Sequence, residues 1–276
     1  RLTPSAYRII SSLQRIKFTQ KILNSFSKNL QYFEKIKDDN DDKKFNKNRE
    51  NIQVKDKIVI KNVKFSYSSK KKLFEDLNLE IKIGSTIGIF GESGSGKSSF
   101  VNLLTGLLKP EKGKILINNI DIFTNIYLWR KNIGYVPQNI FLIDDTVRRN
   151  VALGVSDEKI DNEKVIRCLK NANIYSQFSD SKDKLNTNLG YRGLNLSGGQ
   201  IQRIGIARAL YFEPKIIILD ESTNALDKDT EKVILNEIIN LKANMGFIII
   251  SHKESTMSVC DQIYKIDNGR IIWNFW

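Results

Sequence analysis

The chain has 276 residues, of which 41% are hydrophobic and 27% charged, and this ordinary globular composition excludes collagen-like, mucin-like and wholly disordered classes. Lysine and arginine number 44 against 31 aspartates and glutamates, so the net charge of +13 favours anionic partners: nucleic acid, nucleotide phosphates or a membrane surface. Two cysteines are too few for a disulfide scaffold or a cysteine-based zinc site.

Residues 5–36 are predicted to form one amphipathic helix, because apolar residues recur at three- and four-residue steps. These residues are Ile9, Leu13, Ile16, Leu23, Phe26, Leu30 and Phe33. The charged residues before Phe33 are all basic, which favours a juxtamembrane cytoplasmic position, although a surface helix packed on the domain is the alternative. Residues 38–57 are predicted to form a charged linker. No apolar run approaches the roughly 18 residues that are needed to cross a bilayer. The first residue is Arg1 instead of Met, so we expect the chain to be a piece of a longer polypeptide.

From Ile58 onward the apolar residues alternate, which predicts two half-buried strands. They are formed by Val63, Phe65 and Tyr67 and by Leu77, Leu79, Ile81 and Ile83. A buried strand at 87–90 is followed by a helix that ends before Pro110, and 115–117 is a further strand.

In the second half, apolar runs at 216–219 and 247–250 predict parallel core strands joined by a crossover helix. Residues 263–272 contain Asn268-Gly269 between apolar pairs, which predicts a hairpin. The sequence therefore predicts an α/β domain with some antiparallel sheet.

A glycine-rich loop follows the strand at 87–90. Gly91-Glu92-Ser93-Gly94-Ser95-Gly96-Lys97-Ser98 matches the pattern G-x-x-x-x-G-K-[ST] between a strand and a helix. Such a loop turns its N–H groups towards phosphates, and the helix after it adds the positive end of its dipole. We expect Lys97 to reach the β- and γ-phosphates, Ser98 to ligate Mg²⁺ and Ser99 to join the nucleotide site.

The apolar strand at 216–219 ends in two acids, Asp220 and Glu221. Open α/β sheets bind ligands at the carboxyl ends of their strands, where these acids would stand. We expect Asp220 to hold Mg²⁺, and Glu221 to orient or deprotonate the attacking water.

A second anion site is predicted at Leu196-Ser197-Gly198-Gly199-Gln200, which precedes an apparent helix that runs to Leu210. This stretch could be a simple helix cap, or an exposed helix N-terminus that binds an anion. Because the glycine loop already supplies one phosphate site, the redundancy suggests that Ser197, Gly198, Gly199 and Gln200 serve a nucleotide held by another copy.

The glycine loop, LSGGQ and IIILDE, in that order, resemble an ABC (ATP-binding cassette) nucleotide-binding domain over residues 58–276. The resemblance implies a P-loop ATPase core with an antiparallel β subdomain and a helical subdomain at about 139–196. It further implies that Tyr67 stacks on adenine, that Gln138 senses and ligates Mg²⁺, and that His252 contacts the γ-phosphate. Asp227 would belong to the loop that crosses between protomers.

The resemblance also implies a head-to-tail dimer, in which each ATP lies between the glycine loop of one copy and the LSGGQ of the other. Hydrolysis would remove this bridge. Magnesium would be the metal cofactor.

Within the family, the sequence favours an exporter. The stretch 139–196 is too short for the coiled coil of chromosome-type members, and one cassette per chain differs from the DNA-repair and translation types, so no nucleic-acid partner is expected. Gly190-Tyr191-Arg192-Gly193 is similar to the exporter loop G-E-R-G, with Tyr191 in place of glutamate. Residues 1–37 resemble the cytoplasmic extension of the last transmembrane helix, and their first residues resemble those of lipid-linked oligosaccharide flippases.

The expected protein is thus the ATPase portion of an exporter, at the cytoplasmic face of the plasma membrane. It would pair with a second copy and with a transmembrane domain of the same longer chain. An importer ATPase subunit and a soluble nucleotide switch are the alternatives.

Overall fold

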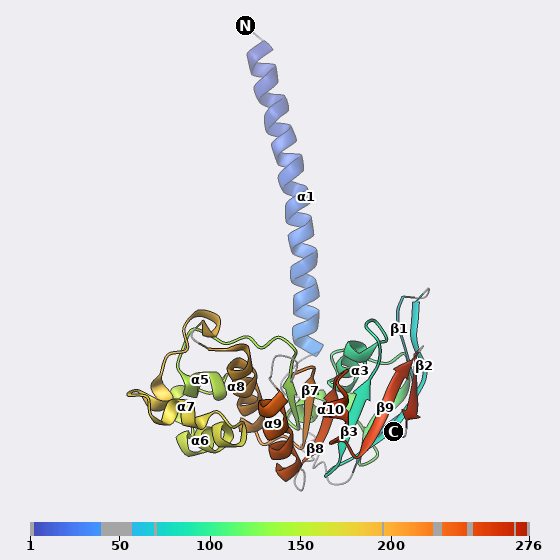
Figure 1. The fold of residues 1–276 in the computed structure, drawn as a ribbon. Helices are drawn as coiled ribbons and strands as arrows, with labels where there is room; N and C mark the ends of the chain where they lie inside the picture. Colours follow the sequence, from blue (N-terminus) through green and yellow to red (C-terminus); the bar gives the residue numbers. More distant parts are fainter. Residues whose placement is uncertain are drawn as a thin grey trace. The chain divides into compact units, whose positions relative to one another are not determined.

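The computed structural model describes residues 3–39, 57–68, 71–194, 196–222, 228–241, 245–267 and 269–274. The chain forms two compact units, residues 1–51 and 52–276 (Figure 1).

The first unit contains the helix α1, Thr3–Asp39. A helix over 5–36 is confirmed, but the expectation that it is amphipathic is wrong. At about 100° per residue, Tyr7, Phe18 and Ile22 lie roughly opposite Ile9, so apolar side chains surround the helix instead of forming one stripe. Within the described residues, no helix combines the length and the apolar character needed to cross a bilayer.

The second unit begins with an antiparallel sheet in the order β2-β1-β4-β5. Its strands are β1 Lys57–Ser68, β2 Lys71–Lys82, β4 Lys112–Ile117 and β5 Ile120–Asp121. The strands predicted from the alternation are confirmed. Val63 and Phe65 of β1 are buried, as are Leu77, Leu79 and Ile81 of β2, whereas Tyr67 is exposed. Ile83 was expected in the second strand and lies just beyond its end, in the turn before β3.

The central sheet has the order β10-β9-β3-β8-β7-β6. Its strands are β3 Thr86–Phe90, β6 Ile133–Val136, β7 Ile216–Asp220, β8 Gly246–Ile250, β9 Gln262–Asp267 and β10 Arg270–Asn274. Strands β6, β7, β8, β3 and β9 are parallel, and β9 and β10 form the predicted antiparallel hairpin. The carboxyl ends of the parallel strands therefore meet at one edge, and the segments that follow them lie together there.

Two hydrophobic clusters cover the two faces of the central sheet. Successive β7 residues alternate between them: Ile216 and Ile218 face one cluster, and Ile217 and Leu219 face the other. Because both faces are covered, the strands read as continuous apolar runs.

The helices are α3 Lys97–Leu104, α4 Ile126–Arg130, α5 Val147–Val151, α6 Asn162–Asn171, α7 Tyr175–Ser179, α8 Gly198–Tyr211, α9 Lys228–Leu241 and α10 Glu254–Met257. Single 3₁₀ turns lie at Ile122–Thr124, Asp157–Lys159, Lys184–Asn186 and Tyr191–Gly193. Figure 1 shows α5, α6, α7 and α8 grouped on one side of the second unit and β1 and β2 on the other. Helix α3 ends earlier than expected, because Gly106 has φ +70° and reverses the chain before Pro110.

Candidate nucleotide-binding and catalytic site

A cleft of about 680 Å³ lies at the carboxyl edge of the parallel strands. Segments that follow β3, β6, β7 and β8 line it, together with residues of β1 and β2. The lining residues are Tyr67, Leu73, Gly91, Glu92, Ser93, Gly94, Gly96, Lys97, Ser98, Ser99, Gln138, Glu221 and His252. Ser95, the remaining residue of the predicted loop, lines an adjoining cleft.

The glycine loop takes a conformation that requires its glycines. Gly94 and Gly96 have φ of +81° and +111°, which L side chains rarely adopt. A Cβ on Gly91 would stand 2.7 Å from the Ile266 carbonyl oxygen, so no other residue fits there. The Lys97 ammonium donates to the carbonyl oxygens of Gly91 and Glu92, at 2.8 and 2.9 Å. The lysine charge is thereby held inside the curve of the loop.

Tyr67 approaches the same loop from β1. Its hydroxyl lies 3.0 Å from the Ser99 Oγ, and Ser99 is buried in the first turn of α3. Tyr67 is 58% exposed and lines the cleft, so its aromatic side chain is accessible there. This position is compatible with stacking on a base.

Asp220 stands at the end of β7 and accepts a hydrogen bond from the Tyr135 hydroxyl at 3.0 Å. Burial raises the pKa of the Asp220 carboxyl; the Tyr135 hydrogen bond opposes this, and the neighbouring Glu221 charge adds to it. Burial and the Asp220 charge also raise the pKa of Tyr135, so its hydroxyl stays protonated and remains a donor.

Glu221 has an unusual backbone. Its φ of +49° is left-handed, which costs a non-glycine residue about 1–2 kcal/mol. Its N–H donates to the Ile250 carbonyl oxygen at 2.9 Å, which ties it to the end of β8. Its Oε2 accepts from the Gln138 Nε2 at 2.9 Å. The structure thus joins two predicted site residues that are 83 positions apart.

His252 follows β8 and lines the cleft together with Gln138 and Glu221. Its side chain is exposed, and the preceding Ser251 is buried and accepts a hydrogen bond from the Lys253 N–H at 3.1 Å. The buried serine and this turn set the direction in which the chain leaves the strand.

Ser197 caps α8 and does not line the cleft. The Gln200 N–H donates to the Ser197 Oγ at 3.3 Å, and the Ser197 N–H donates to the Gln200 Oε1 at 2.6 Å, so the two form a capping box. Gly198 and Gly199 begin the helix between them. None of these four residues lines the cleft that holds the glycine loop. Asp227 lies outside the described residues.

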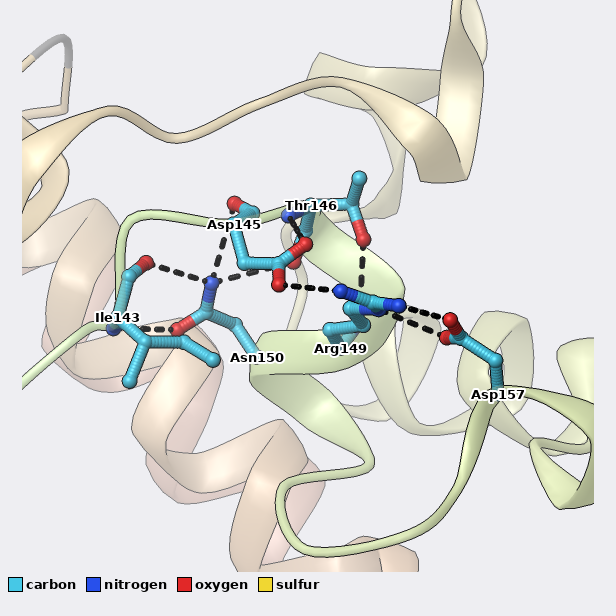
Figure 2. A network of polar contacts seen from close by, with 6 residues as sticks. All are labelled: Ile143, Asp145, Thr146, Arg149, Asn150 and Asp157. Carbon is cyan, nitrogen blue, oxygen red and sulfur yellow. Dashed lines mark hydrogen bonds and ion pairs between the residues drawn. The ribbon is translucent and has the colours of Figure 1, made fainter.

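A polar network joins the segment after Gln138 to α5 (Figure 2), and Arg208 joins it to α8. The buried Asn150 side chain donates to the carbonyl oxygens of Ile143 and Thr146, at 3.0 and 3.1 Å, and accepts from the Ile143 N–H at 3.0 Å. From α8, Arg208 donates to the carbonyl oxygens of Asn150 and Phe141, at 2.8 and 2.9 Å. The chain that leaves Gln138 is therefore bound to the same helix that Ser197 caps.

The predicted Mg²⁺ ligands offer suitable atoms. Ser98 has a hydroxyl, Gln138 has an amide oxygen that is not part of its hydrogen bond to Glu221, and Asp220 has a carboxylate. Magnesium is bound by oxygen atoms and needs few protein carboxylates when phosphates share it. In the described residues no cluster of three His, Cys, Asp or Glu side chains competes for a metal. Ser98 and Gln138 line the cleft, and Asp220 directly precedes Glu221, which also lines it. These oxygen donors fit the ion.

Two contributors to the site were not assigned roles from the sequence. Leu73 lines the cleft from β2, and its apolar side chain carried no signal that separates it from core residues. Tyr135 reaches Asp220 from β6, and only the pairing of strands could reveal this contact.

The family model described as "ABC transporter" matches residues 74–224, more than half of the chain. The chain belongs to the ABC transporter family. The resemblance and the ABC-type ATPase assignment are thereby confirmed, and so is the predicted fold class apart from the amphipathic character of its first helix. The match includes the glycine loop, Ser197 and Glu221.

Two curated relatives share about a third or more of their aligned sequence with this ABC transporter chain. An ATP-dependent lipid A-core flippase of Francisella tularensis subsp. tularensis (strain FSC 198) is 36% identical over 225 residues, which is 81% of this chain and 37% of the flippase. The leukotoxin translocation ATP-binding protein LktB of a Pasteurella haemolytica-like species (strain 5943B) is 39% identical over 222 residues, 80% of this chain and 31% of LktB.

A solved structure of a bacterial Atm1-family ABC exporter with ATP bound is 35% identical, with a TM-score of 0.72, and the alignment covers 78% of this chain and 38% of the exporter. The names of these three proteins favour the predicted exporter class over an importer. The chain spans less than two fifths of the length of each of them.

Proposed function

We propose that this chain binds and hydrolyses ATP and thereby drives an exporter on the cytoplasmic face of a membrane. The observation that carries the proposal is the convergence of Lys97, Gln138, Glu221 and His252 on one cleft, from segments that follow four different parallel strands. A phosphate-binding loop, a carboxylate and a hydrogen-bonding imidazole in one cleft suit phosphoryl transfer to water.

In the proposed reaction, the oxygen of a water molecule bonds to the γ-phosphorus while the bond from that phosphorus to the β,γ-bridging oxygen breaks. Glu221 would orient this water and accept its proton, and the Gln138 amide holds the carboxylate in place. Lys97 and the loop N–H groups would bind the phosphate oxygens, and His252 would donate to the γ-phosphate. When bound, Mg²⁺ would neutralise charge on the β- and γ-phosphates between Ser98, Gln138 and Asp220.

The working unit would be a head-to-tail dimer. Ser197 lies at an exposed helix start outside the cleft, so a copy of the chain cannot use it on its own nucleotide in this arrangement. A second copy could place its Ser197, Gly198 and Gly199 against the γ-phosphate and close the site. Asp227 would lie near that interface.

We further propose that the chain is part of a longer polypeptide with a transmembrane domain, to which α1 leads. The relatives' names include a lipid flippase and a toxin translocator, so the proposal is restricted to the energy-supplying step. The substrate would be selected by contacts within the transmembrane domain.

The proposal is tested by comparing the wild-type chain with Glu221→Gln. The variant keeps the hydrogen-bonding shape but cannot accept a proton, so ATP binding should persist, phosphate release should fall at least a hundredfold, and an ATP-loaded dimer should accumulate. Phosphate release and light scattering with and without MgATP measure this. A variant that hydrolyses ATP at the wild-type rate would remove Glu221 from the proposed role.

A further inference from the structure

The Tyr135 hydroxyl contacts Asp220, one of the proposed Mg²⁺ ligands. On the basis of the proposed ATPase function, we infer that Tyr135 is a positioning residue whose hydroxyl fixes the Asp220 carboxylate for Mg²⁺. The contact that carries the inference is the 3.0 Å hydrogen bond from the Tyr135 hydroxyl to the Asp220 Oδ2.

The register of the parallel strands creates this contact. Tyr135 of β6 is paired with Ile218 of β7, and Asp220 is two residues further along β7. Residues two apart on a strand point to the same face, so Asp220 is the diagonal neighbour of Tyr135. A diagonal neighbour lies beyond the reach of a short side chain but within the reach of an aromatic one. A tyrosine at 135 therefore reaches the carboxylate, and a smaller polar residue would not.

Asp220 needs such a partner. Its carboxylate is partly buried at the end of a strand whose four preceding residues are buried, and it stands beside the carboxylate of Glu221. Among the interactions described for Asp220, the Tyr135 hydroxyl is the only hydrogen-bond donor. A neutral donor holds one carboxylate oxygen without neutralising the charge that attracts the metal.

The expected consequence follows from magnesium chemistry. Mg²⁺ demands near-octahedral ligand geometry, so a carboxylate that rotates freely about its last torsion binds it less well than a fixed one. Hydrogen bonds to ligating carboxylates typically contribute roughly ten- to a hundredfold to metal affinity. Loss of the Tyr135 hydroxyl should therefore weaken the metal-dependent part of nucleotide binding, and should leave the metal-independent part unchanged.

Tyr135→Phe is the appropriate variant, because the ring also has a structural role. The ring lines a second cleft, of about 460 Å³, together with Arg208 and Phe212 of the α8 region. Phenylalanine keeps this wall and removes only the hydroxyl. Tyr264→Phe is the matched control: Tyr264 is a strand tyrosine of the same sheet whose hydroxyl donates to the Gln262 Oε1 at 3.2 Å, on β9.

The experiment is calorimetric titration of ATP into the 276-residue chain, once with excess MgCl₂ and once with EDTA. We expect Tyr135→Phe to reduce the magnesium-promoted gain in ATP affinity about tenfold, with unchanged affinity in EDTA. Tyr264→Phe should behave as wild type under both conditions. In hydrolysis assays, the magnesium concentration for half-maximal rate should rise for Tyr135→Phe alone.

Two results would overturn the inference: an unaltered magnesium dependence in Tyr135→Phe, or an equal loss of affinity in EDTA, which would indicate a general structural effect. A wild-type chain whose ATP binding is indifferent to magnesium would instead overturn the proposed function, on which the inference rests. The two failures are therefore distinguishable.

Discussion

At the scale of single residues, the cleft depends on a few side chains whose chemistry is set by their immediate partners. Lys97 is held by two loop carbonyl oxygens, and Glu221 is held by Gln138 through its side chain and by Ile250 through its backbone. These contacts order both charged groups before any ligand arrives, so binding has less conformational entropy to lose.

Lys97→Ala is expected to weaken ATP binding. The ammonium would make charge-assisted hydrogen bonds to phosphate oxygens, and the loss of such bonds costs roughly 1.5–3 kcal/mol, about tenfold or more in affinity. Titration with ATP measures the change. Lys109→Ala, an exposed lysine just after the α3 segment, is the control and should bind as wild type. Equal affinity of the two variants would contradict the assignment of the glycine loop.

At the scale of elements, α8 and the segment after Gln138 are packed through a glycine. Gly205 lies in the middle of α8, where glycine normally destabilises a helix. A Cβ there would stand 2.2 Å from the Ile140 Cδ1, so glycine permits the close approach of the two segments. Together with the Arg208 bonds to Phe141 and Asn150, this contact holds the segment that leaves Gln138 against the helix that begins after Ser197.

Gly205→Ala should therefore lower stability, against the usual helix-propensity gain, by about 1–3 kcal/mol. Ile140→Ala should also destabilise, because it leaves a void beside the glycine. The double variant should be more stable than the sum of the two losses predicts, since the new methyl fills that void. Urea unfolding of all four proteins measures the coupling. Strict additivity would show that the two side chains do not share the space.

The network around Arg149 makes a second prediction at this scale, for acid stability. The Arg149 guanidinium hydrogen-bonds to Asp145 and Asp157 and lowers the pKa of both carboxyls below 3.8 (Figure 2). Because the pKa of each carboxyl is lower in the folded chain than in the unfolded chain, the unfolded chain binds more protons than the folded chain as pH falls. The stability contributed by these pairs is therefore present above about pH 4 and is lost as pH falls through the lowered pKa values.

Arg149→Met should accordingly lower the melting temperature at pH 6, and the difference from wild type should shrink towards pH 3. Thermal unfolding across this range measures the effect. Arg167→Met is a suitable control, because Arg167 pairs with Glu213 and has no contact with either aspartate in the described network. A difference that grows on acidification would have the wrong sign and would contradict the explanation.

At the scale of the whole molecule, the proposed site is divided between copies. A dimer of two defective chains should therefore regain activity when the defects complement each other. In a mixed dimer of Lys97→Ala and Ser197→Arg, one site would combine the intact glycine loop of one chain with the intact LSGGQ of the other, and the second site would carry both defects.

Each variant alone should be inactive, and an equal mixture should recover about a quarter of the wild-type rate, because half of the dimers are mixed and each has one complete site. Phosphate release from the separate and mixed proteins measures this. Mixing Lys97→Ala with Glu221→Gln is the control and should give no recovery, since both residues belong to the same half-site. No recovery in the first mixture would contradict a shared site.

The amino-acid sequence by itself determined the features that are contiguous in the chain. The glycine loop, the apolar strand that ends at Asp220 and the α8 start at Ser197 were predictable, because turn chemistry, burial on both faces and capping each leave a local pattern. Two predictions from the sequence were wrong. Helix α1 is not amphipathic, because apolar residues lie on its opposite side as well as along the predicted stripe, and α3 ends early, because Gly106 reverses the chain.

Only the tertiary structure decided which distant residues meet. The order and register of the parallel strands bring Tyr135 to Asp220 and Gln138 to Glu221, and they leave Ser197 outside the cleft of its own chain. No local pattern encodes these relations, because strand order and register depend on long-range packing of the two hydrophobic clusters on the sheet.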